Sequence, residues 1–105
     1  MQVIRTVLFE RSWKALGLNE QDYEDLASQI LLNPHAGLVI PGLRGVRKLR
    51  FSIGNKGKRG GGRCVYLVMA ASGTIYLLLV YSKSQREDLS QSQRAVILSV
   101  IEELE

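Results

Sequence analysis

The chain has 105 residues with a formal net charge of +4, and 46% of its residues are apolar. This length and composition suit one domain, residues 1–105, with its own core, and they exclude a disordered chain. One cysteine, Cys64, and one histidine, His35, exclude an internal disulfide and a Cys/His zinc cluster. The sequence has no apolar run long enough for a membrane span and no export signal at its start, so we expect a cytoplasmic protein.

The first third of the chain predicts one strand followed by helices. Residues 3–9 are rich in β-branched side chains, which favours a strand, and residues 10–16 favour one or two helical turns. Asn19 can cap a helix with an acidic first turn, and this helix is expected to stop at Asn33 and Pro34. Its apolar stripe at helical spacing consists of Tyr23, Leu26, Ala27, Ile30 and Leu31.

The rest of the chain predicts three antiparallel strands and a last helix. A connection at 35–45 contains a short extended run at 38–40, and His35 is interpreted as a loop residue. Strands are expected at 46–53, 63–71 and 75–81, with a mobile glycine-rich loop at 54–62 and a short turn at 72–74. Ser90 and Gln93 predict a capping box for the last helix. Its expected buried stripe is Val96, Ile97, Val100, Ile101 and Leu104.

This order of elements predicts a small α+β domain. We expect a curved, mainly antiparallel β-sheet with helices packed on one side. The first strand is expected to pair with a later strand of the sheet.

The positive charge is concentrated in one segment, which contains no acidic residue. Its basic residues are Arg44, Arg47, Lys48, Arg50, Lys56, Lys58, Arg59 and Arg63. Such a segment indicates a site for phosphates or for an acidic partner. The alternative is a solvated, flexible loop.

Strand geometry predicts that several of these cations gather on one face of the sheet. Lys48 and Arg50 alternate onto the same face, about 7 Å apart, and strand pairing brings Arg63 close to them. Tyr81 and Lys83 follow at the end of the next strand. The expected cluster has one phenol and no carboxylate, which excludes glycosidase chemistry and Mg²⁺-dependent phosphoryl transfer. The glycine-rich loop does not match the phosphate-binding motif of nucleotide hydrolases.

The cluster suits binding of a polyanion, or cleavage of RNA without a metal. In such cleavage the 2′-hydroxyl attacks the adjacent phosphate, and cations stabilise the charge that develops. A lysine among other cations could serve as the general base, because like charges disfavour its protonated form. The ring of Tyr66 or Tyr81 could stack on an unpaired base.

Three segments in this order resemble the RelE/HigB superfamily of bacterial toxins, most closely its HigB-type branch. They are residues 45–52 (GVRKLRFS), 56–67 (KGKRGGGRCVYL) and 75–89 (IYLLLVYSKSQREDL). The resemblance implies a RelE-like fold and a toxin that cleaves messenger RNA in the ribosomal A site without metal or other cofactor. It also implies a cognate antitoxin, often with a helix-turn-helix domain, that neutralises the toxin.

Matching the motifs of the superfamily implies a set of site residues. The catalytic positions are Lys48, Arg50, Arg63, Tyr81 and Lys83, and we expect further contacts to RNA or the ribosome from Arg44, Arg47, Lys56, Lys58, Arg59 and Arg86. The acid and base roles stay open, because the C-terminal Tyr or His of some relatives is missing here. Two alternatives stay open as well: a non-catalytic module that binds RNA or the ribosome, and a basic domain that binds an acidic protein.

Overall fold

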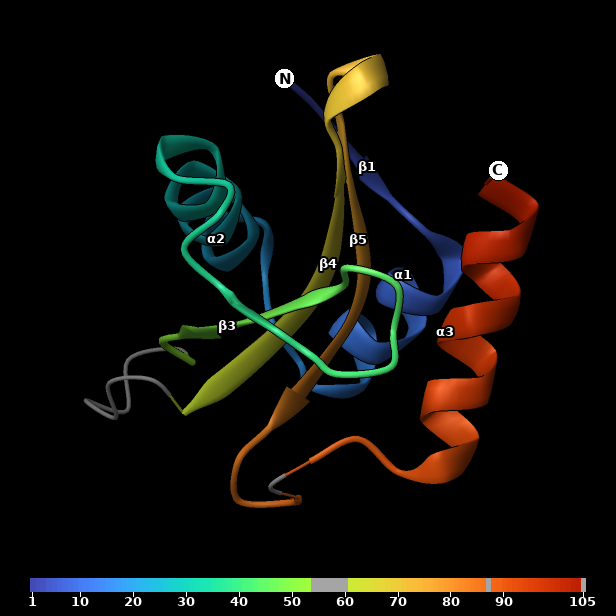
Figure 1. Cartoon of the computed structure of the whole chain (residues 1–105). Coiled ribbons are helices and arrows are strands. Elements are labelled where there is room, and N and C mark those ends of the chain that lie inside the picture. The colour runs from blue at the N-terminus through green and yellow to red at the C-terminus, as the bar shows by residue number, and fades with distance from the viewer. Residues whose placement is uncertain (54–60, 87, 105) are drawn as a thin grey trace.

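The computed structural model describes residues 1–53, 61–86 and 88–104 of the chain (Figure 1). Most of the expected mobile loop at 54–62 lies outside the described residues. The elements are β1 Gln2–Arg5, α1 Val7–Ala15, α2 Glu20–Leu32, β2 Leu38–Val39, β3 Arg47–Phe51, β4 Gly62–Met69, a 3-10 turn Ala70–Ser72, β5 Thr74–Ser82 and α3 Gln91–Leu104. None of the helices in these ranges is long and apolar enough to cross a membrane.

The strands form one five-stranded sheet in the order β1-β5-β4-β3-β2. β1 runs parallel to β5, and every other neighbouring pair is antiparallel. The expected α+β class with a mainly antiparallel sheet is therefore confirmed, as is the long-range pairing of the first strand. β4 and β5 are buried along most of their length because each has a strand on both sides.

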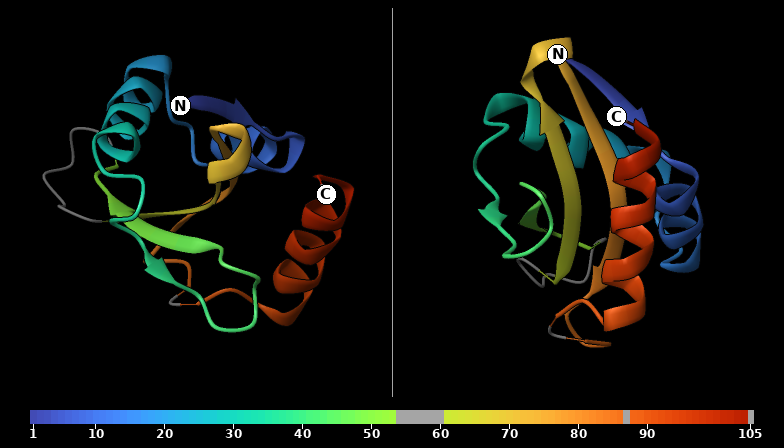
Figure 2. Two further views of the ribbon diagram at one scale, coloured as in Figure 1. Left: turned by 45° about the horizontal axis from the view of Figure 1, so that its top comes forward. Right: turned by 45° about the vertical axis from the view of Figure 1, so that its right-hand side comes forward.

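The helices cover both faces of the sheet, so the expectation of helices on one side is wrong in this detail. On one face α1 and α2 pack against the sheet through Phe9, Trp13, Leu26 and Ile30. On the other face α3 packs through Ile97 and Ile101. Figure 2 shows α2 and α3 on opposite sides of the sheet. The physical reason is that β4 and β5 are apolar on both faces, and both faces must be shielded from water.

The first strand is shorter than expected, and α1 begins where the sequence predicted more strand. Thr6 ends β1 because its hydroxyl accepts a hydrogen bond from the Phe9 amide at 3.1 Å, as an N-cap does. The same hydroxyl donates to the carbonyl of Leu77 in β5 at 2.8 Å, which anchors the cap to the sheet. Phe9 and Trp13 are one helical turn apart, and their rings stack in the core with centroids 5.4 Å apart.

The expected starts of α2 and α3 are confirmed, but the buried apolar stripe of each helix is narrower than the sequence suggests. Asn19 and Asp22 form a reciprocal capping box at the start of α2. Ser90 and Gln93 do the same before α3, at 3.1 and 2.9 Å. In both helices the outermost residue of the stripe is exposed to solvent: Leu31 in α2 and Val96 in α3.

Candidate nucleic-acid interface

A row of basic and phenolic side chains crosses three strands at one end of the sheet. Arg50 in β3 lies directly opposite Arg63 in β4, and Arg63 lies opposite Tyr81 in β5. Lys48 lies two residues before Arg50, on the same face of β3. Lys83 follows β5, where its amide donates to the carbonyl of Gly61 at 2.9 Å. The register thus brings together all five residues that the sequence predicted as catalytic.

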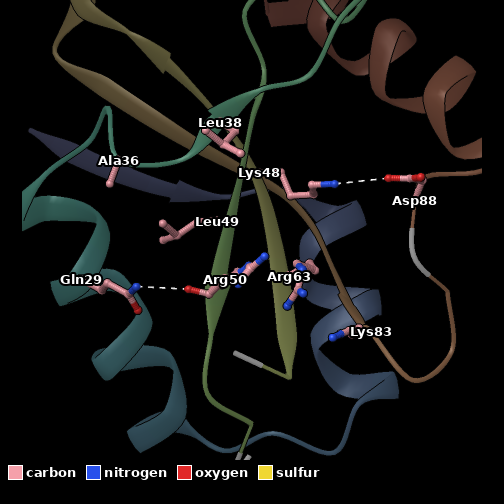
Figure 3. A pocket seen from close by; sticks show the side chains of 9 residues that line it. All are labelled: Gln29, Ala36, Leu38, Lys48, Leu49, Arg50, Arg63, Lys83 and Asp88. Carbon is pink, nitrogen blue, oxygen red and sulfur yellow. Dashed lines mark hydrogen bonds and ion pairs between the residues drawn. The ribbon is translucent and has the colours of Figure 1, made fainter. Parts of the chain in front are cut away.

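Four of these five residues line one pocket of about 430 Å³, which we call the cation pocket (Figure 3). Its lining residues are Gln29, Ala36, Leu38, Lys48, Leu49, Arg50, Arg63, Lys83 and Asp88. Tyr81 belongs to the same row but lines a neighbouring groove that shares Lys48 with the cation pocket. Lys48, Arg50 and Arg63 lie on the face of the sheet against which α3 packs, in a part of that face that α3 does not cover.

Arg50 and Arg63 form a like-charged pair directly across two antiparallel strands. Like charges in this position destabilise a sheet, and Arg63 is only 8% exposed. The Arg63 guanidinium donates to the carbonyl of Gly62 at 3.0 Å, and Gln29 of α2 donates to the Arg50 carbonyl at 3.1 Å. These contacts fix the Arg63 guanidinium and the backbone of Arg50. Arrangements that break a local stability rule occur mostly at functional sites, which makes this pair a candidate site for an anion.

The cation pocket contains a carboxylate that the sequence analysis did not anticipate. Lys48 Nζ lies 3.3 Å from Asp88 Oδ1, and the Asp88 carbonyl accepts from Arg86 at 3.3 Å. The expectation of a cluster without a carboxylate is therefore wrong. Forty residues separate Lys48 from Asp88 in the chain, so strand periodicity could not place them together. The only signal in the sequence was the position of Asp88 shortly after Lys83.

Arg47 and Tyr66, both considered for contacts to RNA, make contacts within the fold. Arg47 points to the α2 side, where Nη1 donates to the carbonyls of His35 and Gly37 at 3.1 and 2.8 Å. Tyr66 is fully buried: its hydroxyl donates to the Pro34 carbonyl at 2.8 Å and accepts from the Gly37 amide at 3.0 Å. Tyr66 therefore cannot stack on a base, and burial raises its pKa above the ordinary value for tyrosine.

The remaining expected contacts differ in position. Arg44 is exposed in the turn before β3 with a positive φ of 56°, and Arg86 is exposed next to Asp88. Lys56, Lys58 and Arg59 lie outside the described residues. The Tyr81 ring is also buried, so its face is not available for stacking.

The single cysteine takes no part in the pocket. Cys64 is fully buried on the opposite face of β4, and burial raises the pKa of its thiol far above the ordinary value. Among the described residues, no three of His, Cys, Asp or Glu are grouped so that they could hold a metal ion.

No protein-family model matches the sequence. Among solved structures, the chain is similar to the E. coli toxin RelE, determined as a double arginine-to-alanine mutant in the free state, with a TM-score of 0.53. The chain has a RelE-like fold. The two sequences are 20% identical over 82% of this chain and 86% of the RelE chain, so the likeness concerns the fold.

Proposed function

We propose that the protein is a ribosome-dependent endoribonuclease toxin that cleaves messenger RNA in the A site without a metal. The observation that supports this most strongly is the Arg50–Arg63 pair in a pocket with Lys48 and Lys83. Four cations and one carboxylate around one hollow suit a phosphodiester, whose negative charge the arginines can bind through two oxygens each. The RelE-like fold supports the same function, and the motif at residues 45–52 favours the HigB-type branch.

The reaction would use the 2′-hydroxyl of the substrate as the nucleophile. The 2′-oxygen attacks the adjacent phosphorus, its proton passes to a base, and the 5′-oxygen leaves with a proton, which yields a 2′,3′-cyclic phosphate. Arg50 and Arg63 would bind the non-bridging oxygens, where charge accumulates in the transition state. Lys48, Lys83 and Tyr81 are the candidates for the two proton transfers.

The proposed partner that neutralises the toxin is an antitoxin with acidic residues and a helix-turn-helix domain. A free cation pocket would bind RNA without selection, so an acidic segment that covers it is expected. Association would then be steered by charge, and the on-rate should fall steeply as salt rises from about 0.05 to 0.3 M.

The test is induced expression in bacteria, followed by mapping of messenger RNA ends on ribosomes. The wild type should arrest growth and create new ends within translated codons. Arg50→Ala should create far fewer, whereas the control Arg11→Ala, which changes an exposed arginine of α1, should match the wild type. Binding to ribosomes without new ends would support the non-catalytic binder and refute the nuclease.

A further inference from the structure

A second hollow adjoins the cation pocket, between β2 and the start of α3. It has a volume of about 500 Å³ and shares Leu38, Lys48 and Asp88 with the cation pocket. The two hollows are therefore neighbours on the molecular surface, with these three residues between them. We call the second one the β2–α3 groove.

The walls of the β2–α3 groove combine apolar and polar groups. β2 contributes Leu38 and Val39, which are 75% and 52% exposed, and Ile40 and Leu89 add further apolar side chains. Exposed aliphatic side chains on a short edge strand gain nothing for folding, which points to a ligand that covers them. Gln91 and Arg94 of α3 supply polar groups at the opposite wall.

The groove is preformed by contacts between its two walls. Arg94 of α3 donates from its guanidinium to the carbonyl of Pro41, which follows β2 in the chain. The capping box of Ser90 and Gln93 fixes the start of α3 next to it. Tyr81 closes the floor between the walls. A preformed groove binds its ligand without a large cost in conformational entropy.

We propose that the β2–α3 groove binds the nucleobase next to the phosphate held in the cation pocket. A nucleotide combines an anion with a flat ring that has apolar faces and a polar edge, and the two neighbouring hollows offer this combination: cations in one, mixed apolar and polar groups in the other. A protein segment would not need a pocket with four cations beside the groove. This inference rests on the proposed function, because it takes the cation pocket as the phosphate site.

The test compares two probes that differ in having bases. The first is a short 2′-O-methyl RNA oligonucleotide, which lacks the nucleophile and cannot be cleaved, and the second is inorganic tripolyphosphate. Val39→Ser, at a residue that lines only the β2–α3 groove, should weaken RNA binding about five- to tenfold, a smaller effect than the loss of an aromatic stacking partner, and should leave tripolyphosphate binding unchanged. The control is Leu32→Ser, which changes an 87% exposed leucine of α2 that lines neither hollow. Gln91→Ala, at an exposed residue that also lines only this groove, provides a second variant in case Val39→Ser lowers the melting temperature.

The outcomes separate this inference from the proposed function. Equal weakening of both probes, or unchanged RNA binding, would overturn the nucleobase site even if the wild type cleaves messenger RNA. Selective weakening of RNA binding in a protein that creates no new ends would retain the base site and reject the nuclease. If Val39→Ser released only a bound protein and not RNA, the groove would be a protein-binding site, which contradicts the inference.

Discussion

Replacing Asp88 by asparagine should strengthen RNA binding, because Asp88 neutralises one of the cations that would contact the phosphate. At the 3.3 Å separation of Lys48 Nζ and Asp88 Oδ1, the attraction of two unit charges in water is about 1.3 kcal/mol. The Asp88 side chain is 84% exposed, so side-chain entropy and screening reduce the net value to about 0.2–1 kcal/mol. RNA must break this ion pair to bind the wild type, whereas the Asp88→Asn variant has no such ion pair to break. Its affinity should therefore rise by up to about fivefold.

The assay is the dissociation constant for the uncleavable RNA oligonucleotide, measured over a range of salt concentrations. The matched control is Glu103→Gln, which removes the same charge at the far end of α3, about 18 Å along the helix from Gln91. The difference between the two variants should shrink as salt rises, because exposed charges are then screened. Asparagine is nearly isosteric and leaves the Arg86 contact to the Asp88 carbonyl in place, so the loop should be kept. Equal gains in both variants would show an effect of net charge and refute the specific role of Asp88.

Three further predictions concern the site and the core. Arg63→Ala should lower the cleavage rate about a hundred- to thousandfold with little change in melting temperature. Arg63→Lys should not restore the rate, because lysine lacks the bidentate geometry of arginine. Full growth arrest by an Arg63→Ala variant that melts like the wild type would remove Arg63 from the site. Tyr66→Phe leaves the buried Gly37 amide without its acceptor, which should cost about 1–3 kcal/mol and lower the melting temperature by about 4–8 °C per kcal/mol, whereas Tyr76→Phe, at a partly exposed position, should change it little. Because burial raises the pKa of Cys64, its thiol should resist alkylation at pH 8 until the protein unfolds, and rapid labelling of the folded protein would contradict this. The free energy of unfolding should fall as the pH rises above 9.0, the ordinary pKa of the thiol, because only the unfolded chain then ionises it.

Local signals in the sequence were sufficient to predict most of the elements. Capping boxes involve residues three positions apart, so Asn19 and Ser90 marked the starts of α2 and α3 correctly. The alternation of β3 also placed Lys48 and Arg50 on one face, because successive side chains of a strand point to opposite sides. These features depend on neighbours along the chain, and their geometry is the same in any fold.

Tertiary structure decided the features that depend on residues far apart in the chain. The Thr6 N-cap is anchored to the sheet because its hydroxyl also donates to the carbonyl of Leu77, a contact across 71 positions. Arg47 donates to the carbonyls of the loop after α2, because that loop lies next to its face of β3.

The carboxylate in the cation pocket has the same kind of origin. Asp88 meets Lys48 only because the chain after β5 returns past β3 before α3 begins. Periodicity and capping describe the geometry of single elements, whereas the charge balance of the pocket depends on how distant elements are placed against one another. The sequence alone therefore determined that Lys48 and Arg50 share a face of β3, and only the folded chain decided that Asp88 lies beside them.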